Sequence, residues 1–159
     1  MVKTLQVSTL DAVSSLFHGG NANVSWVQAL DGLNAEQAHT RPPGLPHSVA
    51  EVVAHVQFWQ AYLLSVLRGE HPPDVAHAAQ GWPEPGEWAV LQETFFRDLS
   101  ALAALAQDEA FMSELDPQDR FRIVPLTSYA GHGLYHLGQV VTVRQLIGAW
   151  PPPGGGDSW

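Results

Sequence analysis

Hydrophobic side chains recur at the 3.6-residue period of an α-helix in four stretches of the chain. This pattern predicts helices over residues 9–30, 48–67, 87–107 and 128–149. Ser48 and Glu51 match a capping box, in which each side chain caps the backbone N–H of the other, and Gly69 marks the end of that helix. Gly19 and Gly20 weaken the first helix and allow a bend, because each Gly costs about 1 kcal/mol against Ala in a helix interior.

The segments between these helices are rich in Pro and Gly or mixed in pattern. Residues 70–86 are predicted to form a long loop, and residues 120–124 a short extended piece. Four helices without a clear strand pattern predict an all-α fold, a four-helix bundle. We expect one domain over residues 1–150, followed by a Pro/Gly-rich tail at 151–159 whose terminal Trp159 can pack back on the body.

Composition narrows the classes of function. The chain has 159 residues and a net charge of −9, with 16 acidic and 7 basic side chains. So few cations argue against nucleic acid and against anionic membrane surfaces as partners. The lack of cysteine excludes disulfides, cysteine zinc sites and a cysteine nucleophile. Because no apolar run approaches the length of a membrane span or of a signal-peptide core, we expect a cytoplasmic protein; a homodimer is left open.

Two histidines share one face of the last predicted helix. His132 and His136 are four residues apart, so their side chains stand one turn apart in the middle of an apolar stripe. This is the helical spacing for two imidazoles on one metal ion, although core histidines with other partners show it too. His55, on the flank of the buried face of the second helix, can complete a set of three. Spacing does not fix this third ligand, because five other histidines are available: His18, His39, His47, His71 and His77.

Two other metal motifs do not match. The zinc-protease helix needs Glu directly after the first histidine, where this chain has Gly133. A carboxylate-bridged di-iron bundle needs Glu-x-x-His pairs on two helices, whereas Glu51 lies four residues before His55. The sequence therefore favours a set of histidines over a carboxylate-bridged pair of metals.

Two segments carry a resemblance to a known family. Residues 48–55, SVAEVVAH, resemble the motif that opens the second helix of the DinB/YfiT-like family, described as candidate metalloenzymes. Residues 132–139, HGLYHLGQ, resemble the motif on the last helix of that family, and the likeness extends over residues 9–153. The resemblance implies a bundle of up-down-down-up topology.

The same resemblance implies a metal site and a chemistry. It implies one divalent ion, zinc or nickel, on His55, His132 and His136. Relatives include thiol-dependent transferases that use low-molecular-weight thiols such as bacillithiol or mycothiol. The implied function is a thiol S-transferase, in which a metal-bound small thiol attacks an electrophilic small molecule. A nucleophile supplied from outside suits a chain without cysteine. The family name refers to DNA-damage induction and does not imply DNA binding.

Other functions stay open at this point. The open position of such a metal can also activate water for hydrolysis, although no carboxylate base is apparent. A non-catalytic metal-binding stress protein and a purely structural histidine cluster are further alternatives, so the sequence does not decide whether the protein is an enzyme. Gln139 and Tyr129 are weak candidates for catalysis. A solvated helix residue and a core aromatic explain them as readily.

Overall fold

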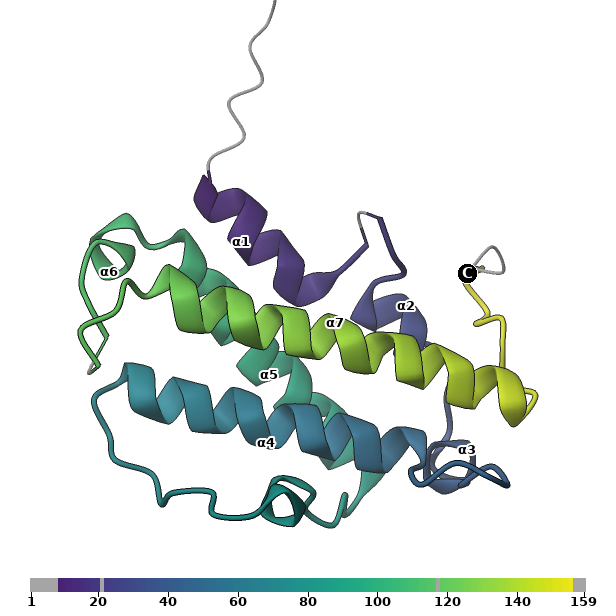
Figure 1. Ribbon diagram of the computed structural model, residues 1–159. Helices are drawn as coiled ribbons and strands as arrows, with labels where there is room; N and C mark the ends of the chain where they lie inside the picture. The colour runs from purple at the N-terminus through teal and green to yellow at the C-terminus, as the bar shows by residue number, and fades with distance from the viewer. Residues whose placement is uncertain (1–8, 21, 117, 156–159) are drawn as a thin grey trace, which may run out of the picture.

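The computed structural model describes residues 9–20, 22–116 and 118–155, and Trp159 of the predicted tail lies outside them. The described residues form helices and two isolated bridges, but no strand (Figure 1). In chain order the elements are α1 (Thr9–His18), α2 (Trp26–Leu30), α3 (Ala35–His39), α4 (Val49–Leu67), the 3₁₀ helix η1 (Ala78–Gly81), α5 (Trp88–Gln107), α6 (Glu109–Met112) and α7 (Ile123–Leu146). The prediction of an all-α fold is confirmed.

Four long helices, α1, α4, α5 and α7, enclose an apolar core. Helix α1 packs on α5 and α7, and α4 packs on the same two helices. The apolar positions that periodicity assigned to the interior of α5 are buried, with Phe95 and Leu102 at 0% exposure. Burial of each such side chain contributes about 1.5–3 kcal/mol. The helical bundle is therefore confirmed, while the up-down-down-up order of its runs stays a prediction.

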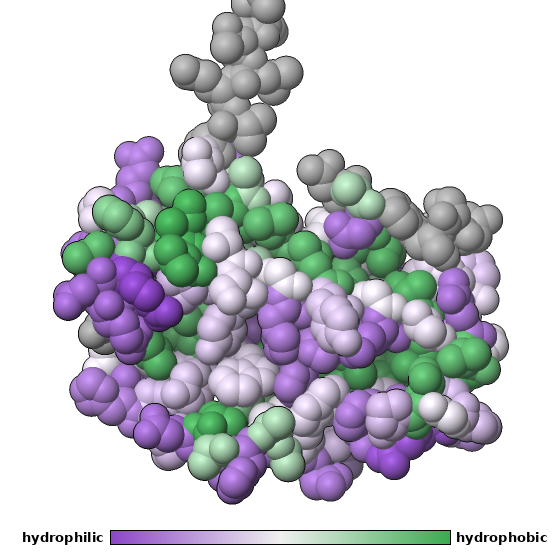
Figure 2. Space-filling model, in the orientation of Figure 1, coloured by the Kyte–Doolittle hydropathy of each residue, from purple (hydrophilic) through white to green (hydrophobic). Residues whose placement is uncertain are grey.

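Figure 2 shows the face of the bundle that α4 and α7 present to the viewer. Hydrophilic and weakly polar side chains cover its middle, and apolar side chains gather at the upper left, around α1, and at the right end. Among the described residues, no helix combines the length and the apolar character needed to cross a membrane. The buried apolar side chains of the long helices pack against one another in the core.

Helix α4 begins and ends as the sequence predicts. The Ser48 hydroxyl accepts a hydrogen bond from the Glu51 N–H at 3.3 Å, and the Glu51 carboxylate accepts one from the Ser48 N–H at 2.7 Å. The helix ends at Leu67, and Gly69 adopts a φ of 79°, which suits a glycine just past a helix. These local signals fix which residues of α4 face the core.

Helices α4 and α7 lie side by side and antiparallel (Figure 1). Near the start of α4, Val52 lines the same cleft as Val143 from the last part of α7. Two turns further along α4, Trp59 lies edge-on to Tyr129 of α7, with ring centres 6.3 Å apart. This register places the middle of α4 against the middle of α7, where the candidate histidines lie.

The predicted first helix, residues 9–30, is wrong in its extent. It breaks because Gly19 and Gly20 adopt φ values of 70° and 89°, a left-handed conformation that favours glycine. A Cβ on Gly19 would lie 2.9 Å from the Val24 carbonyl oxygen, so the turn also needs the missing side chain. Val27, expected to be buried on a continuous helix, is 63% exposed.

Helix α3 was missed, and α2 was predicted only as the end of one continuous helix over residues 9–30. Helix α2 starts behind Ser25, whose hydroxyl accepts the Gln28 N–H at 3.2 Å. Helix α3 starts behind Asn34, whose side-chain oxygen accepts the Gln37 N–H at 2.9 Å. Each pair forms a capping box, and its residue types are recognisable in the sequence. The apolar run of α3 is too short for a periodicity argument to detect, and periodicity alone does not show that α2 starts anew at Ser25.

The last helix begins earlier than predicted. Helix α7 starts at Ile123, so it is shifted toward the N-terminus relative to the predicted 128–149. Pro125 falls in its first turn, where a missing N–H leaves no intrahelical hydrogen bond unmade. The predicted extended piece at 120–124 is correspondingly wrong: only Phe121 takes part in an isolated bridge.

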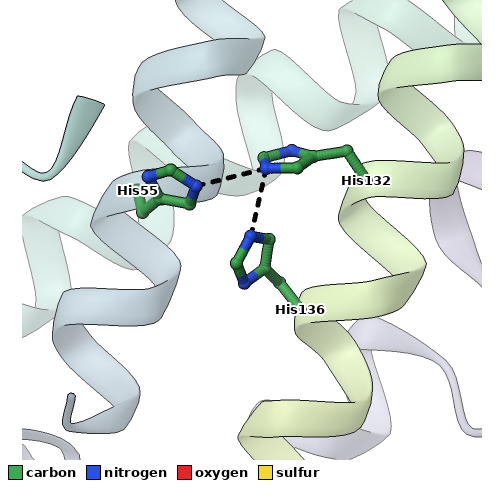
Figure 3. Close-up of side chains that lie close together, drawn as sticks. All are labelled: His55, His132 and His136. Atoms are coloured by element: carbon green, nitrogen blue, oxygen red, sulfur yellow. Dashed lines mark hydrogen bonds between the residues drawn. The ribbon is translucent and has the colours of Figure 1, made fainter. Parts of the chain in front are cut away.

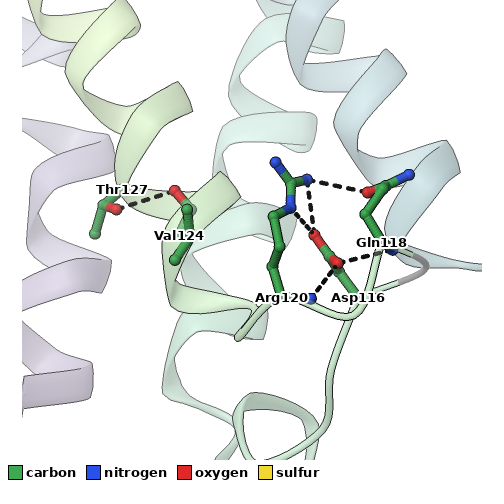
Figure 4. A network of polar contacts seen from close by, with 5 residues as sticks. All are labelled: Asp116, Gln118, Arg120, Val124 and Thr127. Atoms are coloured by element: carbon green, nitrogen blue, oxygen red, sulfur yellow. Dashed lines mark hydrogen bonds and ion pairs between the residues drawn. The ribbon is translucent and has the colours of Figure 1, made fainter.

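The loop before α7 is closed by Asp116 (Figure 4). Its carboxylate accepts the backbone N–H groups of Gln118 and Arg120, both at 2.9 Å, and Nε of Arg120, also at 2.9 Å. At the start of α7, the Thr127 hydroxyl donates to the Val124 carbonyl at 3.1 Å. These contacts fix the point at which the chain enters α7.

A buried arginine ties α7 to the end of α2, and sequence analysis missed it. Arg144 is 2% exposed, and its guanidinium donates to the carbonyls of Ala29 at 2.7 Å, Asp31 at 3.0 Å and Ala149 at 3.0 Å. Carbonyls at a helix C-terminus lack intrahelical partners and attract a cation. The Gly154 N–H donates to the Asp31 carboxylate at 3.3 Å, so the start of the tail lies against the same corner.

We expect Arg144→Ala to lower the free energy of unfolding by about 3 kcal/mol, because buried carbonyls lose a charged donor. Urea denaturation measures the change. Arg68→Ala, at an exposed position, is the matched control and should shift stability by less than about 0.5 kcal/mol. Equal unfolding midpoints for the two variants would show that the Arg144 contacts are unimportant.

Candidate metal centre

Three imidazole rings converge between the middle of α4 and the middle of α7 (Figure 3). His55 comes from α4, and His132 and His136 lie one turn apart on α7. Nε2 of His132 is 3.1 Å from Nε2 of His55 and 3.0 Å from Nε2 of His136. One ring nitrogen from each lies within 4.8 Å of the others. The structure thus brings together the three histidines that the sequence singled out.

The outer nitrogens of two of these rings meet acceptors. Nδ1 of His55 donates to the Gly81 carbonyl oxygen at 2.5 Å, and Nδ1 of His136 donates to Oε1 of Gln139 at 2.7 Å. A carbonyl oxygen only accepts, so each Nδ1 carries the proton and each Nε2 presents a lone pair to the cluster. Outer hydrogen bonds of this kind fix the tautomer and ring orientation of metal-binding histidines.

The donor set fits a divalent metal ion. The lone pairs of His55 and His136 both face Nε2 of His132, which carries at most one proton and satisfies only one of them well. A cation at the centre satisfies all three lone pairs together. Around a tetrahedral zinc ion with Zn–N bonds of about 2.0–2.1 Å, ligand nitrogens lie about 3.3 Å apart. The separations of 3.0 Å and 3.1 Å are close to that geometry, and all three ligand nitrogens lie within 4.8 Å of one another.

Burial keeps the rings in the form that binds metal. Removal from water lowers the pKa of His55, His132 and His136, and a neighbouring imidazole lowers each pKa further. The hydrogen bonds of His55 to Gly81 and of His136 to Gln139 act in the opposite direction without reversing the shift. Neutral imidazole, the metal-binding form, therefore persists to lower pH than in water.

The loop at residues 70–86 supplies contacts that the sequence did not reveal. Besides the Gly81 carbonyl, Trp82 stacks on His55 with ring centres 3.9 Å apart and planes 12° apart. His47 stacks on Trp82 at 3.7 Å and 10°. Two imidazoles this close to one indole must cover opposite faces, so Trp82 is held between them. Helical periodicity gives no signal for residues in loops, which is why these contacts were missed.

Gln139 links the cluster to a cleft. Besides its contact with His136, Gln139 donates through Nε2 to the Tyr135 hydroxyl at 3.2 Å. Both side chains line a cleft of about 280 Å³ whose other lining includes the apolar Leu45 and Val52. The structure therefore places Gln139 where it orients a ring of the cluster, and a catalytic role for Gln139 stays a prediction.

Tyr129, the other catalytic candidate, lies one turn before His132 on α7. It is half-buried, and burial raises the pKa of its hydroxyl. Its ring packs edge-on to Trp59, as expected for a core aromatic. It lines a small cavity together with His132, so it lies next to the cluster but makes no direct hydrogen bond with it.

The remaining candidate histidines do not join the cluster. Four of them are exposed: His18, His39, His71 and His77. His39 bonds the carbonyl oxygens of Ala35 and Gly86 instead. Within the described ranges, the three histidines form the only group of three or more histidine, cysteine or carboxylate side chains close enough to share a metal ion.

Glu51, the acidic side chain closest in sequence to His55, makes its contacts outside the histidine cluster. It caps α4 through Ser48 and pairs with Arg41. Burial alone would raise the pKa of Glu51, but the hydrogen bonds with Arg41 and Ser48 lower it overall. Glu51 is therefore an ionised structural carboxylate, which leaves the cluster with neutral ligands.

The fold and the cluster define a helical-bundle protein with a three-histidine site that can hold a metal ion. The sequence profile of the DinB superfamily matches residues 24–139, which include all three histidines. The match covers well over half of the chain, and the protein belongs to the DinB superfamily. The resemblance seen in the sequence is confirmed. No curated protein and no solved structure shows a significant match.

The cluster should make stability depend on pH. Its histidines have a lower pKa in the folded chain than the value of about 6.5 expected after unfolding, so the unfolded chain binds more protons as the pH falls. The stabilisation is fully present above about pH 6.5 and is lost as the pH falls through the folded-state values.

Denaturation of metal-free protein at about pH 7.5 and about pH 5 measures this loss. We expect His136→Gln to lose less stability between the two pH values than wild type. His71→Gln, which changes an exposed histidine, should lose as much as wild type. The same loss in all three proteins would rule out the cluster as the source.

Proposed function

We propose that the protein is a metal-dependent thiol S-transferase, with His55, His132 and His136 as the ligands of one divalent ion. The observation that supports this most directly is the convergence of three Nε2 atoms without a carboxylate among the group. Imidazole ligands suit zinc and nickel, and we expect one of these two ions.

Neutral ligands decide which chemistry the site favours. Three imidazoles leave the charge of a divalent ion uncompensated, and three protein ligands leave a fourth position open. When bound there, a divalent ion would lower the pKa of a thiol that coordinates it. The chain contains no cysteine, so the thiol has to come from a small molecule. Its partner in the reaction would be an electrophilic small molecule.

The chain's own residues would position the reactants. The acceptors on Gly81 and Gln139 hold two rings with their lone pairs toward the centre. Trp82 covers one face of His55 and keeps water from that side. The cleft beside Gln139 is mainly apolar, with His47, Tyr135 and Thr142 as its other polar lining residues, which suits the body of a small organic molecule.

A hydrolase is the alternative. Activation of water at a metal usually needs a carboxylate or another base within hydrogen-bond reach. Glu51, the acidic side chain closest in sequence to His55, is occupied by Arg41 and by the α4 cap. This arrangement favours the thiol reaction over hydrolysis.

Metal analysis tests the ligand set. Wild-type protein, purified without a His tag or chelating resin, should contain about one zinc or nickel ion per chain by mass spectrometry. His55→Ala, His132→Ala and His136→Ala should each lose it, while His71→Ala should keep it. Metal-free wild type, or metal retained by all three cluster variants, would contradict the proposal.

Cobalt substitution tests whether a small thiol coordinates the metal ion. Addition of a small thiol such as 2-mercaptoethanol should change the visible absorption of the cobalt protein, because sulfur enters the coordination sphere. Turnover of an electrophilic aryl halide should require both thiol and metal. Ester hydrolysis that proceeds without thiol would support the hydrolase instead, and an unchanged cobalt spectrum would exclude the transferase.

A further inference from the structure

His132 differs from the other two rings of the cluster. His55 and His136 each donate from Nδ1 to a protein acceptor. Among the residues that the structure describes, His132 makes its hydrogen bonds through Nε2, and Nδ1 has no hydrogen-bond partner. Figure 3 shows this second nitrogen turned away from the point where the rings converge. The ring at the centre of the cluster is thus the one without an outer partner.

A small cavity adjoins His132. His132 and Tyr129 from α7 and Trp59 and Gln60 from α4 line it, together with apolar core side chains. Its volume is about 10 Å³, which is room for one water molecule. A cavity of this size stays dry when its walls are apolar and takes up water when they carry unpaired polar atoms.

Gln60 supplies such an atom. Its side chain is 5% exposed, and Oε1 has no hydrogen-bond partner among the described residues. A buried amide oxygen almost always has a partner, either protein or ordered water. Gln60 therefore lines the same cavity as His132 and has a buried oxygen without a partner, while Nδ1 of His132 makes no hydrogen bond within the described chain.

We propose that one ordered water molecule occupies this cavity and joins the two groups. The water accepts the Nδ1–H of His132 and donates one of its own hydrogens to Oε1 of Gln60. Gln60 is then a positioning residue, because it holds His132, through the water, with its Nε2 lone pair toward the cluster. All three rings would have an outer partner: Gly81 for His55, Gln139 for His136 and the Gln60 water for His132. The effect on metal affinity rests on the proposed function, but the water site does not.

Gln60→Met tests the proposal, because it keeps the length of the side chain and removes the acceptor. The dissociation constant for zinc, measured by competition with a chromogenic chelator, should rise about 10–100-fold. The urea midpoint of the metal-free protein should stay equal to wild type or fall slightly, since the variant removes the oxygen together with its water-mediated hydrogen bond. Gln60→Glu, which keeps an oxygen at that position, should restore the affinity.

Gln57→Met is the matched control, because Gln57 lies on the same helix but donates to Asp98 at 2.9 Å. It should leave zinc affinity unchanged. Unchanged affinity in Gln60→Met, with wild-type affinity measured alongside, would overturn the positioning role. Gln60→Leu provides the same comparison if Gln60→Met does not fold.

A high-resolution crystal structure tests the water itself. We expect one ordered water within about 3 Å of both Oε1 of Gln60 and Nδ1 of His132 in wild type, and none in Gln60→Met. A dry cavity in wild type would overturn the proposal. Because this result does not need bound metal, a wild-type protein that contains the water but binds no zinc would refute the proposed function and leave the water site standing.

Discussion

Three imidazole nitrogens between α4 and α7 need hydrogen-bond or metal partners at the same point. The packing of the two helices around them depends on which partners they find. His55 and His136 are 7% and 4% exposed, so solvent reaches their rings poorly. Buried polar atoms without partners are costly, and Nε2 of His132 can satisfy only one of the two lone pairs that face it. A cation at the centre would satisfy all three nitrogens and join the two helices. The same nitrogens that make the site chemically useful therefore also govern how α4 meets α7.

The loop at residues 70–86 is part of this arrangement and not a passive connection. Its Gly81 carbonyl fixes the tautomer of His55, and a Cβ on Gly81 would lie 3.0 Å from Nε1 of Trp59, so only a residue without a side chain approaches this closely. Trp82 then fills the space between His55 and His47. Because one ligand takes both its hydrogen bond and its stacking partner from this loop, a shift of η1 would turn the His55 ring. Metal binding at the cluster would thus be coupled to order in the loop through the side chain of His55.

Sequence alone predicted the parts of the site that depend on helical phase. His132 and His136 share a face because they are one turn apart, and the capping box at Ser48 fixed the phase of α4 well enough to place His55 on its buried side. The choice of His55 over His47 came from family resemblance, since it depends on the register between two helices, which no local pattern encodes.

The features that the sequence analysis did not predict also depend on backbone conformation or on contacts between elements. The break after α1 comes from the left-handed backbone at Gly19, where periodicity of the side chains on both sides suggested one helix. Arg144 was missed because a lone arginine on a helix is normally exposed, and only the corner at α2 provides carbonyl acceptors for it in the interior. Local signals gave the elements, whereas contacts between elements had to be seen in the structure.

The distribution of carboxylates gives the last step of the functional argument. Asp98 is 5% exposed, but it accepts from Gln57 at 2.9 Å and pairs with Arg97 at 2.9 Å, while Glu51 pairs with Arg41 and caps α4. In the part of the chain that the structure describes, no carboxylate joins the histidine group. A divalent ion there keeps most of its charge, and that charge acts on whatever occupies the open position. A thiol, once ionised, brings the missing negative charge itself, whereas water would still need a base for its proton. Under the proposed function, the protein would contribute three neutral ligands and an apolar surround, and the anion that completes the site would come from the small molecule.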